Sequence, residues 1–214
     1  GALVALWVLG RVVTLTTAVP TALAALLDGA FLPALAVALA APLVRAGKPG
    51  NLVFLPILAI FAVGNALIWT EALGWTRGTA ATGLEVGLFC TLMLIAVIGG
   101  RVLPFFIRAA LPQSTSRSWP WVERVALGTL PLAALAPVLA WIPAVAHTVR
   151  LVGWHDRRLW RVPLLWVLYL GYAWLPIGLA LRASGAHPFA ALHALTAGCI
   201  GMLILGMMAR VALG

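Results

Sequence analysis

Charged residues are scarce in this chain of 214 residues, where Asp, Glu, Lys and Arg together make up 9% of the sequence. A soluble domain usually carries about 25%, because its surface has to stay hydrated. Cysteine is scarce too: Cys90 and Cys199 each lie inside an apolar run, and no CxxC or Cys/His cluster occurs. These absences exclude a water-soluble enzyme, a disordered tail, a disulfide-rich secreted module and a Cys/His zinc site.

Hydrophobic residues make up 64% of the chain, and they occur in successive runs. Runs of about 20 apolar residues predict an all-α fold, a polytopic transmembrane helical bundle. The expected spans are residues 2–19, 21–44, 52–73, 82–111, 162–182 and 188–213. We expect the fourth span to break at Gly99, Gly100 and Pro104, where the backbone can bend and a donor is missing.

Residues 122–152 are also apolar, but Pro131, Pro137 and Pro143 interrupt them. This segment either crosses the membrane once or forms a hairpin near Pro137, and we expect about seven membrane elements in all. A hairpin would place most basic residues on one side: Arg45, Lys48, Arg108, Arg117, Arg124, Arg150, Arg157, Arg158 and Arg161. Because such an asymmetry is typical of the cytoplasmic face, it favours the hairpin with the arginine-rich side in the cytoplasm.

The net charge is +9, which in a soluble protein would indicate a nucleic-acid partner. Here most basic residues lie in short loops between apolar runs, so we interpret them as orientation signals and lipid-headgroup contacts. The expected partner is therefore the lipid bilayer, with no role for nucleic acid. Tryptophans at span ends are interpreted as interfacial anchors: Trp69, Trp75, Trp119, Trp121, Trp154 and Trp160.

Arg11 and Asp28 are ionisable residues inside the apolar runs, where charge is costly and often functional. Arg11 lies nine residues before Pro20 and Asp28 eight residues after it, so a helical hairpin would bring them to the same depth. The pair is either a polar site, such as part of a proton relay, or a buried ion pair that fixes helix register, and we favour the ion pair.

Arg101 follows the glycine pair within the string GGRVLPFF. Its side chain either extends along a kinked helix to the membrane surface, or donates to freed carbonyls or to an anionic group such as a propionate. Tyr169 and Tyr172 form an aromatic stripe on the span 162–182, which we interpret as packing.

Two histidines are candidate ligands for haem or another metal. His193 lies near the start of the last span, where small residues at Ala194, Ala197, Gly198 and Gly201 allow a neighbouring helix or a flat cofactor to approach. A lone histidine is more often a hydrogen-bonded core residue, and both interpretations stay open. His147 lies on the second half of the proline-rich hairpin and is the second candidate.

Seven strings, taken in order, carry a family resemblance: LWVLGR at 6–11, DGAFLP at 28–33, NLVF at 51–54, GGRVLPFF at 99–106, RLVGW at 150–154, HALT at 193–196 and MMARVALG at 207–214. Together with PLLW and GYAW in the span 162–182, they resemble the C-terminal half of the NnrS family. Positions that match the family's motifs are Arg11, Asp28, Asn65, Gly99, Gly100, Arg101, Pro104, His147, Arg150, Trp154, His193 and Arg210.

This resemblance implies a bacterial inner-membrane protein of about twelve spans, associated with nitric oxide and denitrification and containing haem and copper. Residues 1–214 would then form a single transmembrane domain, with the N-terminal half of the same protein as partner.

The chain departs from the family's pattern at two positions. Tyr169 stands where the family usually has histidine, and Trp69 stands where it often does. Both losses put the full metal complement in question.

The leading hypothesis is a haem-binding, and secondarily copper-binding, membrane protein of the nitric oxide or nitrosative-stress response, with nitric oxide as a small-molecule ligand. His193 and His147 are the expected metal ligands, and Arg101 is an expected cofactor contact. The alternative is a transporter or permease in which Arg11, Asp28 and a broken fourth span line a pathway. A third hypothesis is a scaffold for an electron-transfer complex. Catalytic residues and enzyme status stay open.

Overall fold

The structure is a computed structural model that describes residues 1–213, with side chains through Ala212. Helices and loops account for this range, and no strand occurs in it, so the predicted all-α fold is confirmed. The chain forms two compact units, and the division falls inside α5, after Cys90.

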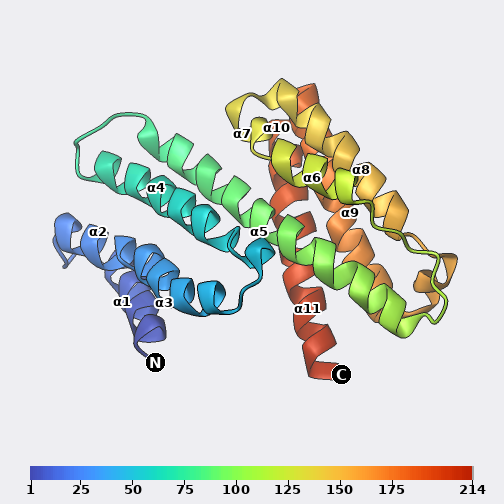
Figure 1. The fold of residues 1–214 in the computed structure, drawn as a ribbon. Helices are drawn as coiled ribbons and strands as arrows, with labels where there is room; N and C mark the ends of the chain where they lie inside the picture. Colours follow the sequence, from blue (N-terminus) through green and yellow to red (C-terminus); the bar gives the residue numbers. More distant parts are fainter. Residues whose placement is uncertain (214) are drawn as a thin grey trace. The chain divides into compact units, whose positions relative to one another are not determined.

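The first unit, Gly1–Cys90, is built from antiparallel helix pairs (Figure 1). Its elements are α1 (Ala2–Thr14), α2 (Thr21–Gly29), α3 (Phe31–Arg45), η1 (Pro49–Asn51), α4 (Phe54–Ala72) and the first part of α5 (Thr79–Ala110). Helix α1 ends at Thr14, and Pro20 directly precedes α2 and disfavours a helical conformation at Val19. Helix α2 packs against α1, and α3 packs against α4.

The second unit begins at Thr91 and is organised around α9 (Figure 1). Its elements are the rest of α5, α6 (Pro120–Thr129), α7 (Leu132–Leu135), η2 (Pro137–Ala140), α8 (Trp141–Trp154), η3 (Arg157–Arg161), α9 (Pro163–Ser184), α10 (Pro188–His193), η4 (Ala194–Gly201) and α11 (Met202–Leu213). Helix α9 packs against α8 and along the whole of α10, η4 and α11. Its glycines Gly171 and Gly178 allow Leu203 and Leu195 to approach its backbone closely.

Five helical segments within residues 1–213 are long and apolar enough to cross a membrane. They are Thr21–Arg45, Pro49–Ala72, Thr79–Ala110, Pro163–Ser184 and Pro188–Ala212. Helix α1 is a shorter apolar helix. These segments make the chain a membrane protein, and they coincide with five of the spans expected from the sequence.

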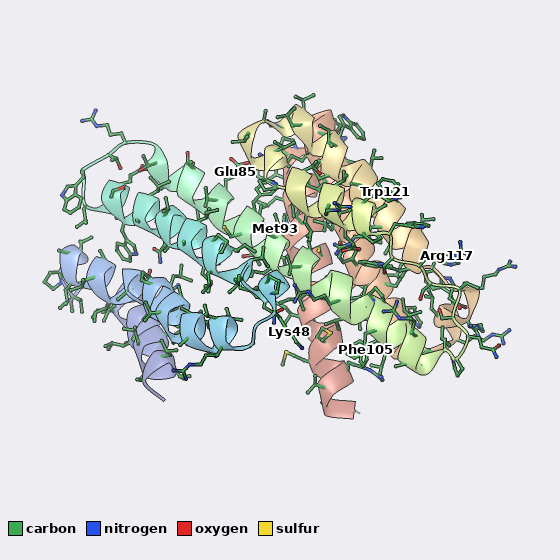
Figure 2. The ribbon with its side chains drawn as sticks, in the orientation of Figure 1. Lys48, Glu85, Met93, Phe105, Arg117 and Trp121 are labelled. Atoms are coloured by element: carbon green, nitrogen blue, oxygen red, sulfur yellow. The ribbon has the colours of Figure 1, made fainter. Side chains whose placement is uncertain are left out.

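The proline-rich segment folds back on itself as a hairpin, as predicted. Helices α6 and α8 lie side by side, and the Arg117 amide donates to the Gly153 carbonyl at 2.7 Å. Figure 2 marks Arg117 in the loop before α6 and Trp121 in its first turn. The reversal lies between α6 and α8, where Pro131 precedes α7 and Pro137 begins η2. Prolines at these positions lose no helical hydrogen bond.

The predicted break in the fourth span is wrong, because α5 is helical without interruption from Thr79 to Ala110. Pro104 lies inside this helix and removes one donor. Leu103 and Ile107 on either side of it are buried, whereas Phe105, labelled in Figure 2, is 60% exposed. Packing against the rest of the second unit therefore holds this stretch helical in spite of the missing donor. The glycine pair serves close packing instead of bending, as shown below.

The last span contains a π-helical segment, η4, that the sequence analysis did not predict. At this place side chains of α9 and η4 interlock: Leu195 lies over Gly178, and Trp174 lies over Gly198, where an added Cβ would come within 2.7 Å of the indole. The neighbouring element that approaches the small residues after His193 is therefore α9, through Trp174. π-Helical turns are rare and frequently occur at functional sites.

Candidate functional site

A buried arginine, Arg150, is the centre of a polar cluster in the second unit. Arg150 lies on α8 and is 2% exposed. Its Nε donates to Glu123 Oε1 at 2.8 Å, and its Nη2 donates to Glu123 Oε2 in a very short contact. Its Nη1 donates to the Ala96 carbonyl at 2.8 Å and to the Tyr172 hydroxyl at 2.5 Å. The guanidinium is therefore charge-compensated and hydrogen-bonded on all sides, as a buried charge requires.

The glycine pair on α5 makes room for this cluster. A Cβ at Gly100 would overlap the Arg150 guanidinium, and a Cβ at Gly99 would lie 3.2 Å from Tyr172 Cε2. On the other side the Trp154 ring covers the guanidinium, with 4.9 Å between Arg150 Cζ and the ring centroid. Trp154 is fully buried, so its interpretation as an interfacial anchor was wrong.

His147 joins the same cluster through Tyr172. The imidazole is fully buried on α8, and its Nδ1 lies 2.7 Å from the Tyr172 hydroxyl oxygen. Since that oxygen already accepts from Arg150, the bond is made either by the tyrosine proton or by a histidine Nδ1 proton. His147 Nε2 is buried without a hydrogen-bond partner, and the Ala126 carbonyl lies near the ring but outside hydrogen-bond geometry. A buried polar atom of this kind is normally satisfied by a bound water or by a ligand.

The second candidate ligand, His193, has a different environment. It is the last residue of α10, its side chain is exposed, and its Nδ1 lies 2.8 Å from the Phe189 carbonyl. The neighbouring Thr196 hydroxyl donates to the Leu192 carbonyl and makes no hydrogen bond to the imidazole. Within residues 1–212 no hydrogen bond or ring contact joins His193 to His147, and no group of three or more His, Cys, Asp or Glu side chains could hold a metal ion.

The predicted pair Arg11 and Asp28 meets in the first unit, which confirms the ion pair. Asp28 is 6% exposed, and its Oδ2 also accepts from Asn65 Nδ2 at 3.2 Å and from Trp69 Nε1 at 2.9 Å. The Arg11 side chain is 52% exposed. Gly10 brings α1 and α2 together, since a Cβ there would lie 3.2 Å from Asp28 Cα. The role of Trp69 as a half-buried donor to Asp28 was missed, because its position near a span end indicated an anchor.

Replacing Asp28 with asparagine should destabilise the first unit by about 1–2 kcal/mol. The loss is moderate because Arg11 keeps access to its surroundings, although its charge loses its partner. Detergent-based unfolding followed by circular dichroism measures the change. A double variant, Asp28→Leu with Arg11→Leu, should recover much of the stability, and equal behaviour of the single and double variants would show that the ion pair contributes nothing.

Arg101 and Arg210, two further predicted site residues, lie outside the buried cluster. Arg101 is exposed on α5, and the space beside the glycine pair is taken by Arg150. Arg210 lies on α11, where its guanidinium carbon is 5.0 Å from the centroid of the Phe106 ring. Neither arginine contacts His147 or His193 through a bond seen within residues 1–212.

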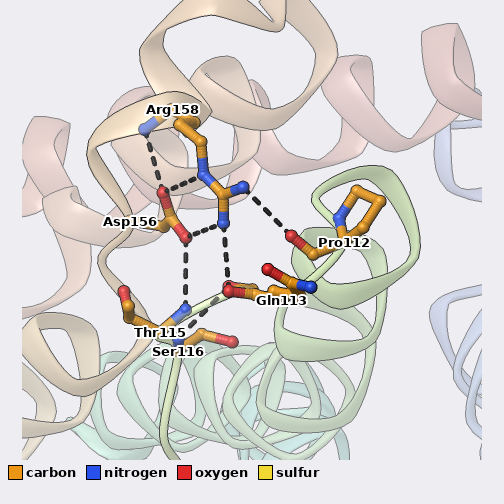
Figure 3. Close-up of polar contacts among 7 residues, drawn as sticks. Pro112, Gln113, Thr115, Ser116, Asp156 and Arg158 are labelled. Carbon is orange, nitrogen blue, oxygen red and sulfur yellow. Dashed lines mark hydrogen bonds and ion pairs between the residues drawn. The ribbon is translucent and has the colours of Figure 1, made fainter.

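A separate polar clamp ties the loop after α5 to η3 (Figure 3). Asp156 accepts from Arg158 Nη2 at 2.9 Å and from the Thr115 amide at 3.2 Å, while Arg158 donates to the Pro112 and Gln113 carbonyls. The hydrogen bonds from Arg158 hold the pKa of Asp156 far below its ordinary value. The carboxylate therefore stays ionised at physiological pH, and the clamp is structural.

Apolar helices of spanning length, with charged side chains paired between them, define an all-α polytopic membrane protein. The family of NnrS proteins matches this chain over residues 1–214, so the chain belongs to the NnrS family. This match confirms the resemblance found in the sequence. No curated protein and no solved structure matches the chain.

Proposed function

We propose that this chain is part of a bacterial inner-membrane protein that binds haem, takes nitric oxide as a small-molecule ligand and acts in the response to nitrosative stress during denitrification. Membership of the NnrS family supports the link to nitric oxide. The observation that carries the haem proposal is the environment of His193, whose imidazole is exposed on an apolar helix with one ring nitrogen already held.

A ligating histidine almost always has its second ring nitrogen fixed by a carbonyl or carboxylate. The Phe189 carbonyl does this for His193 Nδ1, which leaves Nε2 for the iron. Ala197, one turn further on, is also exposed and adds no bulk beside the ring. Haem bound there would supply the binding of diatomic gases. The opposite wall of the haem pocket would come from the N-terminal half of the same protein.

Copper fits the described part of the chain less well. His147 offers one free imidazole nitrogen, with Tyr172 holding the other. Copper sites are built from several nitrogen or sulfur ligands, and residues 1–212 contain no group of three or more His, Cys, Asp or Glu side chains that could hold a metal ion. We therefore assign no copper site to these residues, and His147 is the reserve candidate for haem.

Replacing His193 with alanine in the full-length protein should abolish or shift the Soret band of the haem, because the iron loses its ligand. Membrane insertion should be unchanged, since it depends on apolar length and flanking charge. His187→Ala is the control, because His187 is exposed in the loop before α10 and should leave the spectrum unchanged. A His193→Ala protein with full haem content and an unaltered spectrum would contradict the assignment, and His147 would then be the candidate haem ligand.

The transporter alternative rests on the Arg11–Asp28 pair alone, since α5 is unbroken and offers no gap for a substrate path. The three polar partners of Asp28 also satisfy its carboxylate, as a register-fixing ion pair requires. Substrate-dependent flux in vesicles would support the transporter.

A further inference from the structure

An apolar groove of about 280 Å³ runs between α5 and α11 in the second unit. Its walls include Ile98, Gly99 and Val102 on α5, and Leu203, Ile204 and Met207 on α11. Ile204 is 52% exposed and Met208, at the rim, is 64% exposed, so the groove is open at the surface of the second unit. From residue 95 to residue 103 it extends for about 12 Å along α5.

The two helices that form the groove run in the same direction. Gly99 and Leu203 line it together, and one to two turns further on Arg210 lies over Phe106. Both helices therefore proceed from the groove toward the end of α5 that carries Arg108. In a membrane this is the arginine-rich side of the second unit, which also includes Arg157 and Arg161. The groove thus leads from the apolar interior to a basic rim.

We propose that this groove binds one acyl chain of an anionic phospholipid, with the lipid phosphate at Arg210. The apolar lining suits the chain, and the guanidinium at the rim suits a phosphate, which it can bind through two parallel hydrogen bonds. Arg210 has no carboxylate partner within residues 1–212, and stacking on Phe106 holds its position. Neither α11 nor the stretch of α5 after Thr91 contains an acidic residue that could take the place of the lipid.

A second copy of the chain is a poorer occupant. A twofold axis along the membrane normal would bring the basic rim of each copy toward that of the other, and no acidic residue on α11 would compensate this repulsion. An acyl chain fills a narrow groove between two helices without this cost. The anionic headgroup supplies the negative counter-charge that Arg210 lacks within residues 1–212.

Native mass spectrometry of the purified protein, released from nanodiscs of mixed phosphatidylglycerol and phosphatidylcholine with identical chains, tests this proposal. We expect phosphatidylglycerol to be retained preferentially. Arg210→Gln should lower its retention about fivefold, because the phosphate loses the guanidinium that binds it directly. Arg161→Gln removes the same charge from η3, which lies on the same side of the membrane but contributes no residue to the groove, so the preference for phosphatidylglycerol should persist.

A second pair of variants tests the groove itself. Ile204→Trp places a large ring in the groove and should displace the bound lipid, whereas Leu205→Trp, on an adjacent exposed residue that does not line the groove, should not. Equal losses from Arg210→Gln and Arg161→Gln would show diffuse surface attraction and overturn the proposal. Equal retention of both lipids, or a lipid-free dimer that Ile204→Trp dissociates, would overturn it as well.

Discussion

Replacing Glu123 with glutamine should destabilise the protein by about 3–5 kcal/mol, because it leaves the buried Arg150 guanidinium without its counter-charge. Arg150 is 2% exposed, and both of its donors toward Glu123 bind the carboxylate directly. Glutamine has nearly the same shape but offers one acceptor and no charge. Unfolding by denaturing detergent, followed by far-UV circular dichroism, measures the loss.

A double variant shows whether the loss comes from the unpaired charge. Glu123→Leu combined with Arg150→Met removes both charges and should be much more stable than Glu123→Gln alone, since apolar residues of similar size often replace a buried ion pair at little cost. Glu71→Gln is the matched control. Glu71 accepts from the Ala80 amide and pairs with no buried cation, so its replacement should cost about 1 kcal/mol. Similar losses at Glu123 and Glu71 would contradict the role of Arg150.

The sequence allowed one of the two ion pairs between α-helices to be predicted, and the same reasoning could have found the other. Arg11 and Asp28 lie nine and eight residues from Pro20, and the structure pairs them. Glu123 and Arg150 lie fourteen and thirteen residues from Pro137, the expected turn of the second hairpin, and the structure pairs them too. Arg150 was instead counted with the basic surface residues, because a charge count does not show which way a side chain points.

Other features of the site depend on packing between distant segments. Tyr172 lies within an apolar span, and its role became visible only when α8 and α9 were placed side by side, with its hydroxyl between Arg150 and His147. The π-helical segment after His193 packs against side chains of α9, such as Trp174. The residue pattern of the last span alone does not show these contacts. The spans themselves could be predicted from the length of the apolar runs, because the thickness of the bilayer sets how many consecutive apolar residues a spanning helix needs.

The glycine pair shows how a correct observation led to a wrong structure. Two adjacent glycines and a proline predict a bend, because glycine is permissive and proline removes a donor. In the structure α5 stays helical, and the missing side chains give space to Arg150 and Tyr172. Glycines in membrane helices often serve such close approach. From the sequence alone the bend and the close approach could not be distinguished, since the approaching group comes from another helix.

Gly100→Ala should therefore destabilise the protein by about 3–5 kcal/mol, as much as the loss of the ion pair itself. The added Cβ would overlap the Arg150 guanidinium. A flexible arginine on a surface would move aside at little cost. Here the guanidinium is bound to Glu123, Tyr172 and the Ala96 carbonyl, so any displacement breaks several buried hydrogen bonds at once.

Gly128→Ala is the control for this variant, because Gly128 lies in α6 with open space around its Cα. There the substitution should be neutral or stabilise by about 0.5–1 kcal/mol, since alanine suits a helix better than glycine. In an Arg150→Met background Gly100→Ala should cost far less than in the native protein, because the guanidinium it displaces is gone. If Gly100→Ala and Gly128→Ala unfold at the same detergent concentration, the close approach of Arg150 to Gly100 contributes nothing to the stability of the protein.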